Sequence, residues 1–175
     1  MRLLPRDARV SAAILATALV FLGGLVVTMI PRETTPAAAS MASAVRPHAG
    51  EVERNFQQGV VMLHAKRYEF AIAAFHKVLE YAPDMPEAHV NMGFALEGLG
   101  HHKEAQDFFE SATALRPGQA NAYYGMAMAL EGLGDLRGAI GAMRTYVHLS
   151  PADDPHRRRA ESALWEWEEQ VDSRN

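Results

Sequence analysis

The pattern of hydrophobic and polar positions changes twice along the chain. From Val10 to Ile30 there is no charged residue, and the segment reads VSAAILATALVFLGGLVVTMI. Residues 31–50 are rich in Pro, Ala and Ser and show no sustained apolar period. From residue 51 onward, apolar residues recur at spacings of three and four, which is typical of one face of an α-helix. The pattern predicts an apolar segment, a linker and an all-α body.

The apolar segment has the length of a membrane span. Its 21 residues would form a helix about 31 Å long at about 1.5 Å per residue, and the hydrocarbon core of a bilayer is about 30 Å thick. Arg2, Arg6 and Arg9 precede the segment, whereas only Arg32 follows it closely. The positive-inside rule then leaves residues 1–9 in the cytoplasm and places the rest of the chain across the membrane.

A cleaved signal peptide is the alternative to this anchor. Ala42–Ala44 reads ASA, the small-residue pattern of a cleavage site. The apolar run is longer than the usual ~7–15 residues of a signal peptide, and the candidate site lies well beyond its end. The sequence therefore favours an uncleaved transmembrane helix at residues 10–30, followed by a tether at residues 31–50.

The helical body repeats itself at an interval of 34 residues. The hexapeptide ALEGLG occurs at residues 95–100 and again at residues 129–134. Other positions recur at the same offset: Pro83, Pro117 and Pro151; Ala71, Ala105 and Ala139; Phe75, Phe109 and Met143; Gly59, Gly93 and Ala127. Gly100 and Gly134 mark a turn in two copies, and Lys66 takes that place in the first.

Each copy contains two apolar-periodic stretches with a turn between them. In the second copy we expect helices over about Pro86–Gly98 and His102–Leu115, brought close together by the small Gly93 and Ala105. Phe109 and Leu115 should point toward the next copy, and Pro117 should end the second helix. Because one hairpin cannot bury its apolar face alone, stacking three gives a continuous core.

A last helix in residues 154–175 should cover the open end of the stack. Asp154 is a plausible N-cap and Pro155 fits the first helical position. The apolar stripe that would cover the stack is Ala160, Leu164, Trp167 and Val171, with Trp165 at its margin.

The 34-residue period with these columns resembles the tetratricopeptide repeat (TPR) family. The resemblance covers three repeats, at about residues 52–85, 86–119 and 120–153 of a domain spanning 51–153. It implies a right-handed superhelical stack of three helix hairpins. This chain departs from the family at two positions early in each repeat, where a large aromatic residue and a leucine are usual. The aromatic position holds Asn55, His89 and Tyr123, and the leucine position holds Gln58, Met92 and Met126.

Charge and chemistry narrow the possible functions. From Glu51 onward there are 12 Lys and Arg against 19 Asp and Glu, a net charge of −7, so the phosphate backbone of nucleic acid would be repelled. There is no cysteine, and we find no phosphate-binding loop, hydrolase elbow or metalloprotease motif. The eight histidines include no pair at the i, i+4 spacing of metal ligands on one helix face. We therefore predict no enzyme activity, no cofactor and no metal site.

In TPR proteins the first helix of each hairpin lines a concave groove, and the resemblance transfers that role to twelve positions here. They are Phe56, Val60, Leu63 and His64; Val90, Asn91, Phe94 and Glu97; and Asn121, Tyr124, Met128 and Glu131.

TPR proteins that hold an acidic C-terminal tail carry basic and asparagine side chains in these columns. The first repeat has Phe56 and Val60 there, the third has Asn121 and Gly125, and only Asn91 matches. Since no cation is placed to pair with a carboxylate, we expect no carboxylate clamp.

The remaining groove surface is apolar, with two glutamates at one border. The apolar positions are Phe56, Val60, Phe94, Tyr124 and Met128, which suit an amphipathic or hydrophobic peptide. Helical periodicity alone leaves open whether Phe94 and Tyr124 lie in the groove or in the core.

One N-terminal span followed by a short TPR array resembles the layout of bacterial envelope TPR proteins. That layout implies an inner-membrane, single-pass protein whose repeats face the periplasm and bind a protein or peptide. Envelope assembly or maturation is the implied role, with c-type cytochrome maturation first. The alternative is a self-associating scaffold on the membrane.

Overall fold

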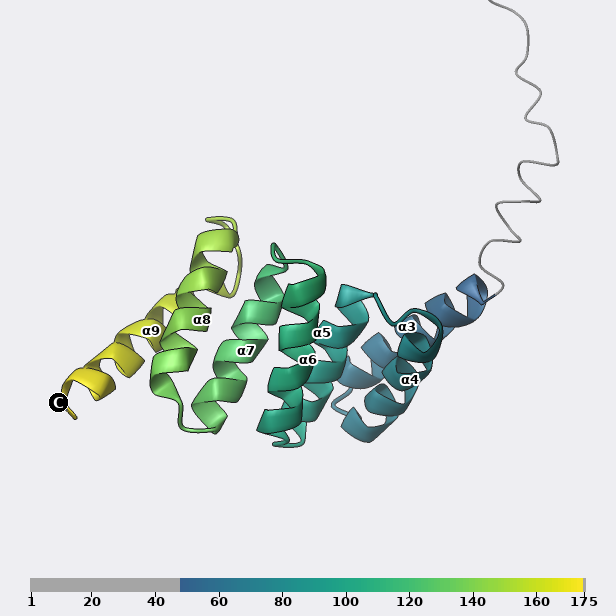
Figure 1. The fold of residues 1–175 in the computed structure, drawn as a ribbon, viewed down its shortest axis with the longest axis horizontal. Helices are drawn as coiled ribbons and strands as arrows, with labels where there is room; N and C mark the ends of the chain where they lie inside the picture. Colours follow the sequence, from purple (N-terminus) through teal and green to yellow (C-terminus); the bar gives the residue numbers. More distant parts are fainter. Residues whose placement is uncertain (1–47, 175) are drawn as a thin grey trace, which may run out of the picture. The chain divides into compact units, whose positions relative to one another are not determined.

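The computed structural model describes residues 48–174, which form seven helices and no strand (Figure 1). The helices are α3 (Ala49–His64), α4 (Tyr68–Tyr81), α5 (Pro86–Gly98), α6 (His102–Leu115), α7 (Ala120–Gly132), α8 (Leu136–Leu149) and α9 (Arg157–Asp172). The second-repeat helices α5 and α6 have the predicted bounds. Helix α3 begins at Ala49, inside the last residues of the predicted linker.

The helices pack as three successive hairpins, α3–α4, α5–α6 and α7–α8, followed by α9 (Figure 1). Each hairpin also packs on the next one through α4–α5 and α6–α7 contacts. The first helices α3, α5 and α7 touch in turn, and we call them the first-helix layer. This arrangement is a helical-hairpin solenoid.

The turn inside each hairpin has the same backbone conformation in all three repeats. Lys66, Gly100 and Gly134 have φ angles of 56°, 78° and 81°. Because side chains other than glycine rarely adopt positive φ, glycine is favoured at this point. In each turn the next backbone N–H bonds a carbonyl five residues earlier, as for His101 to Leu96 at 3.0 Å, which is the Schellman closure of a helix. The predicted turn positions are therefore confirmed.

Glycines in the first helices of the hairpins leave space for the phenylalanine rings of the second helices. A Cβ atom added at Gly93 would lie 2.7 Å from the Phe109 ring, and one at Gly125, in the following repeat, would lie 2.2 Å from it. Phe109 is fully buried, so it fills the space between α5 and α7 as predicted. Leu115 does not follow the prediction, because 41% of it stays exposed.

Helix α9 covers the last hairpin with the predicted stripe. Ala160 and Trp167 are 0% and 3% exposed, and Leu164 and Val171 pack against the same cluster. The predicted start of this helix is wrong, because α9 begins at Arg157. The Asp154 carboxylate accepts bonds from Tyr146 Oη and from the His156 backbone N–H instead, at 2.6 and 2.8 Å. Residues 154–156 therefore form a turn that precedes the helix.

The predicted membrane span at Val10–Ile30 lies outside the described residues. Within residues 48–174, every helix is too short or too polar to cross a bilayer.

Candidate functional site

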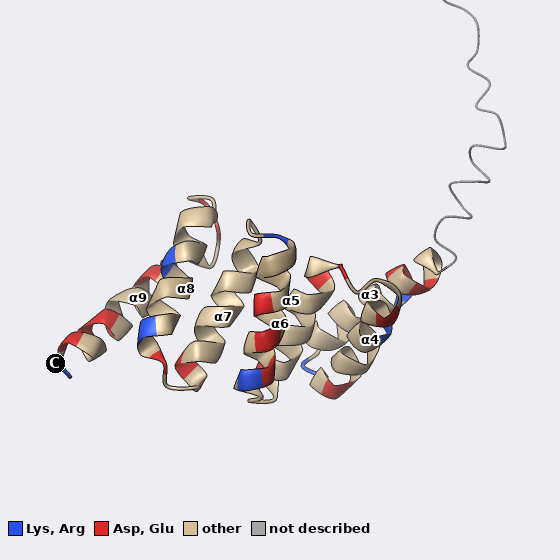
Figure 2. Cartoon of the chain, in the orientation of Figure 1, with Lys and Arg blue, Asp and Glu red and all other residues tan. Residues whose placement is uncertain are grey.

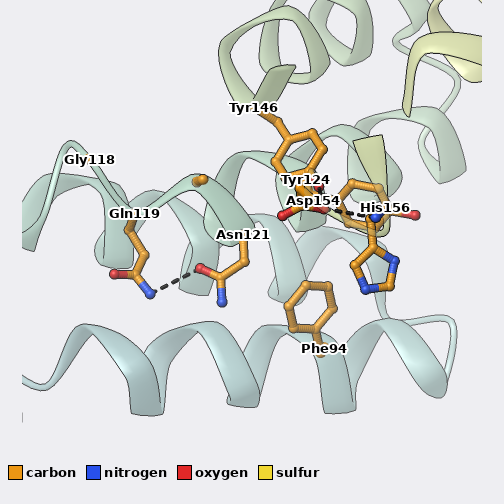
Figure 3. Close-up of a pocket in the computed structure, with 9 residues that line it drawn as sticks. Phe94, Gly118, Gln119, Asn121, Tyr124, Tyr146, Asp154 and His156 are labelled. Carbon is orange, nitrogen blue, oxygen red and sulfur yellow. Dashed lines mark hydrogen bonds between the residues drawn. The ribbon is translucent and has the colours of Figure 1, made fainter. Parts of the chain in front are cut away.

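A pocket of about 550 Å³ lies between α5, α7, α8 and the turn that leads into α9 (Figure 3). The N-terminal part of α7 and the residues before it form one side. The end of α8 and the 154–156 turn form the other side. The lining residues are Phe94, Gly118, Gln119, Ala120, Asn121, Tyr124, Tyr146, Asp154 and His156.

Aromatic rings form the floor of the pocket. Tyr124 and Tyr146 meet edge to face with ring centroids 5.2 Å apart, and Phe94 meets the buried Phe109 edge to face at 5.1 Å. Phe94 and Tyr124 thus pack against the core on one side and line the pocket on the other. The structure therefore shows both rings packed on the core, and their role in a binding groove stays a prediction.

A hydrogen-bonded pair, Tyr146 and Asp154, lies at one side of the pocket (Figure 3). Burial, together with the bond to Asp154, raises the pKa of Tyr146 to about 12. The bond from Tyr146, followed by the bond from the His156 backbone N–H, lowers the pKa of Asp154. At neutral pH the pair is therefore a phenol that donates to a charged carboxylate.

Arg157 fixes the turn that carries Asp154 and His156. Its Nη1 donates to the backbone carbonyls of Val147 and Ser150, at 2.8 and 2.9 Å, and its Nε donates to Glu161 at 3.0 Å. These bonds join the end of α8 to the first turn of α9. The carboxylate of Asp154 is thus held in place by contacts on both sides of the turn.

Amide side chains form the opposite side of the pocket. Gln119 Nε2 donates to Asn121 Oδ1 at 2.9 Å, and Arg116 Nη1 donates to Gln119 Oε1 at 3.0 Å. Arg116 also pairs with Glu87, so its charge is balanced outside the pocket. This side offers polar groups but carries no net charge.

The structure gathers only three of the twelve predicted groove residues in the pocket, namely Phe94, Asn121 and Tyr124. Phe56, Val60 and Leu63 are half-buried against the core at the α3 end, and Met128 is half-buried against the second cluster. His64 is exposed and Asn91 is half-buried. The assignment of Val90 is wrong, because it is 1% exposed and belongs to the core.

The two border glutamates have partners within the fold. His102 Nδ1 lies 2.5 Å from Glu97 Oε1, and Trp167 Nε1 donates to Glu131 Oε1 at 3.0 Å. They serve the turn and the end cap rather than an open surface. Among residues 48–174, His, Asp and Glu side chains form no group of three placed to hold a metal ion.

Sequence reasoning missed Gln119, Tyr146, Asp154 and His156 as pocket residues. The repeat register held a signal for two of them. Tyr146 follows Val78 and Ala112 at intervals of 34, and Asp154 follows Pro86 and Ala120. At these two repeat positions the earlier copies have apolar residues, and the last copy has a phenol and a carboxylate. The last repeat therefore differs from the first two at these positions.

The fold and its pocket define a helical-hairpin repeat protein. Residues 62–114 match the family described as tetratricopeptide repeat. The matched segment lies within the first two of the three repeats, and the 34-residue register and the three similar turns agree with this match. No curated protein sequence matches it significantly.

Several solved structures have a similar fold. The Sgt2 TPR domain of Aspergillus fumigatus has a TM-score of 0.66 and 22% identity, covering 71% of this chain and 82% of that one. The TPR2B domain of yeast Sti1, in a complex with pHsp70, has a TM-score of 0.65 and 17% identity, covering 70% and 99%. The type III secretion translocator chaperone SycD of Yersinia enterocolitica has a TM-score of 0.65 and 14% identity, covering 70% and 96%.

Proposed function

We propose that this chain is an interaction module whose TPR domain binds a segment of another polypeptide at the pocket in the first-helix layer. The observation that carries this proposal is the pocket itself, with its aromatic floor and its polar groups on two sides. Aromatic surface gives an anchor for a side chain, and flanking polar groups can bond the main chain. The domain does no chemistry of its own in this proposal.

Two structures with the same fold support peptide binding by analogy. The Sti1 domain is in a complex with pHsp70, and the first TPR domain of Spaghetti is bound to the Hsp90 peptide SRMEEVD. The second peptide is acidic at its end. This pocket includes Asp154 and no Lys or Arg in its lining, so it does not suit an acidic segment.

The remaining part of the proposal concerns location. The uncharged run Val10–Ile30 would anchor the chain in the inner membrane, with the repeats on the periplasmic side. A tethered binding module in that place suits assembly or maturation of envelope proteins, and maturation of c-type cytochromes is our first candidate.

A self-associating scaffold is the second candidate. Large apolar side chains are exposed at both ends of the array, including Val61 at 58% and Phe70 at 53% near one end and Trp165 at 65% on α9. Such surfaces could join copies end to end. If size-exclusion chromatography with light scattering shows that the full-length chain in detergent has one protomer at all concentrations, this candidate is excluded.

Site-specific photocrosslinking in membranes tests the binding proposal. Asn121 is exposed and lines the pocket, whereas Ala114 is exposed on α6 outside it. We expect p-benzoylphenylalanine at position 121 to give a discrete adduct with another polypeptide, and the same group at position 114 to give none. Equal adducts from both positions, or none from position 121, would contradict the proposal.

Cysteine labelling tests the location, and the absence of native cysteine gives a clean background. We expect Ala152→Cys to react with a membrane-impermeant maleimide in spheroplasts and Ala8→Cys to react only after lysis. The reverse pattern would contradict the orientation. Loss of Ala8→Cys from the mature chain, read by mass spectrometry, would replace the anchor with a cleaved leader.

A further inference from the structure

The charge of the pocket points to the chemistry of the segment that it binds. Asp154 is the only Asp, Glu, Lys or Arg residue in its lining. Its Oδ1 atom already accepts bonds from Tyr146 and from the His156 backbone. These bonds fix the carboxylate in position, and the lowered pKa keeps it charged at neutral pH. A fixed anion at the edge of an aromatic pocket is a feature that a bound cation can use.

The aromatic floor favours the same kind of ligand. Tyr124 lies between Tyr146 and the His156 ring, whose centroids are 5.2 and 6.0 Å from its own, and Phe94 also lines the pocket. A guanidinium or ammonium group within about 6 Å of such a ring is attracted by the π-system. The methylene stem of a long basic side chain can also cover apolar surface.

The charge of the whole repeat domain acts in the same direction. Residues 48–174 carry 12 Lys and Arg and 19 Asp and Glu, so their net charge is 12 − 19 = −7. Acidic residues lie on α3, α4, α6 and α9 (Figure 2). Arg116, which bonds Gln119 at the pocket, is paired with Glu87, and Arg157, which holds the turn that carries Asp154, is paired with Glu161. A basic segment would therefore be attracted both at long range and at the pocket.

We propose that this pocket takes an arginine or lysine side chain of the bound segment, with its methylene stem against Phe94 and Tyr124 and its charged head at Asp154. The proposal rests on the peptide-binding function above and adds the chemistry of its anchor residue. Gln119 and Asn121 would then bond the main chain of the segment on the opposite side of the pocket.

Other anchors fit less well. An apolar side chain that closed the pocket would remove Asp154 from water without giving it a counter-charge, and burial of an unpaired charge is costly. An acidic side chain would be placed next to a carboxylate of the same sign. A basic side chain is the anchor that compensates the charge and also uses the rings.

Selection from a random peptide library displayed on phage, against the full-length chain in detergent, tests the anchor. We expect peptides enriched on the natural chain to share an Arg or Lys at one position. Replacing that residue by citrulline or norleucine in a synthetic peptide should lower affinity at least about tenfold, as loss of a charge pair does. Asp154→Lys should select an acidic residue at the same position.

Matched variants separate a charge effect from a folding effect. Asp154→Asn keeps an oxygen to accept the bonds from Tyr146 and His156, so it should still fold, with a melting temperature lowered only by the loss of the charge from these bonds. It should lose the preference for Arg or Lys. Asp153→Asn removes the same charge one residue away, outside the pocket lining, and it should bind as the natural chain does. Equal loss in both variants would overturn the proposal, since only net charge would then matter.

The failure of this proposal is distinguishable from the failure of the proposed function. The enriched peptides could compete with one another and crosslink to position 121 and yet share no basic residue. This result would overturn the basic anchor and leave peptide binding in place. If no peptide is enriched over an Asn121→Trp variant with a blocked pocket, both proposals are wrong. Enriched Arg or Lys peptides that bind Asp154→Asn equally well would overturn the role of Asp154.

Discussion

The indole of Trp167 donates a hydrogen bond of 3.0 Å to Glu131, across a separation of 36 residues in sequence. This bond joins the end helix α9 to the last residues of α7, and Trp167 is 3% exposed. The corresponding glutamate one repeat earlier, Glu97, pairs with His102 instead. The end cap therefore replaces, in the last repeat, a contact that the hairpin makes for itself in the preceding one.

Trp167→Phe should lower the free energy of unfolding by about 2 kcal/mol, because it removes a bond to a charged acceptor and part of a buried ring. Chemical denaturation of the full-length chain measures this. Trp165→Phe is the matched control, since Trp165 is 65% exposed, and it should change stability by less than about 0.5 kcal/mol. If the two variants are equally stable, the cap contact has no energetic importance.

Alanine substitutions at two glycines should have opposite effects on stability, because Gly125 lies against the buried Phe109 ring and Gly141 has open space around it. Gly125→Ala places a methyl group 2.2 Å from a buried ring, and overpacking of about 1–3 kcal/mol should exceed the helix-propensity gain of about 1 kcal/mol. Gly141→Ala, with nothing within 4 Å of the new atom, should stabilise α8 by about 0.5–1 kcal/mol. Thermal melting distinguishes the two, and a stabilised Gly125→Ala would show that the ring can move aside.

The repeat register explains why so much of the fold was predictable from sequence. Helix bounds and turns recur every 34 residues, so each of these positions is supported by two other copies. The Gly–Phe contact within a hairpin occurs in the first two copies, at Gly59–Phe75 and Gly93–Phe109, and the third copy has Ala127 and Met143 there. The prediction failed where the recurrence ends. Asp154 was expected to cap α9, but its carboxylate binds Tyr146. A contact between two residues that occurs in only one copy produces no periodic pattern in the sequence.

The candidate site was harder to predict for the same physical reason. Periodicity gives the side of a helix on which a residue lies, but not how closely the neighbouring helix covers it. Phe56, Val90 and Tyr124 occupy one column, yet Val90 is 1% exposed while Tyr124 lines the pocket. The pocket depends on the turn before α9, which exists only after the third repeat.

The turn at Lys66 offers a stabilising substitution. Lys66 has a φ angle of 56° where the other repeats use glycine, and this left-handed conformation costs a side chain about 1–2 kcal/mol. Lys66→Gly should therefore raise the free energy of unfolding by about 0.5–1 kcal/mol, after the larger entropy of the unfolded glycine chain is included. Lys66→Ala keeps the Cβ atom and should give no gain. A stabilisation that appears equally in both variants would point to the lysine charge instead of the backbone.

The Tyr146–Asp154 pair predicts how stability depends on pH at both extremes. Tyr146 has a pKa raised to about 12, so its contribution is full below the ordinary value of about 10 and is lost as pH rises from there toward 12. Asp154 has a lowered pKa, so its contribution is present above the ordinary carboxyl range and is lost as pH falls through the lowered value. Denaturation over a pH series should show both losses.

Tyr146→Phe separates the two partners. It should remove the alkaline loss and also weaken the acid loss, because Asp154 then lacks the donor that lowers its pKa. In a spectrophotometric titration of the five tyrosines, the component that ionises near pH 12 should disappear in this variant, and Tyr123→Phe should leave it in place. If the component remains in Tyr146→Phe, another phenol carries the raised pKa, and the hydrogen bond to Asp154 does not control it.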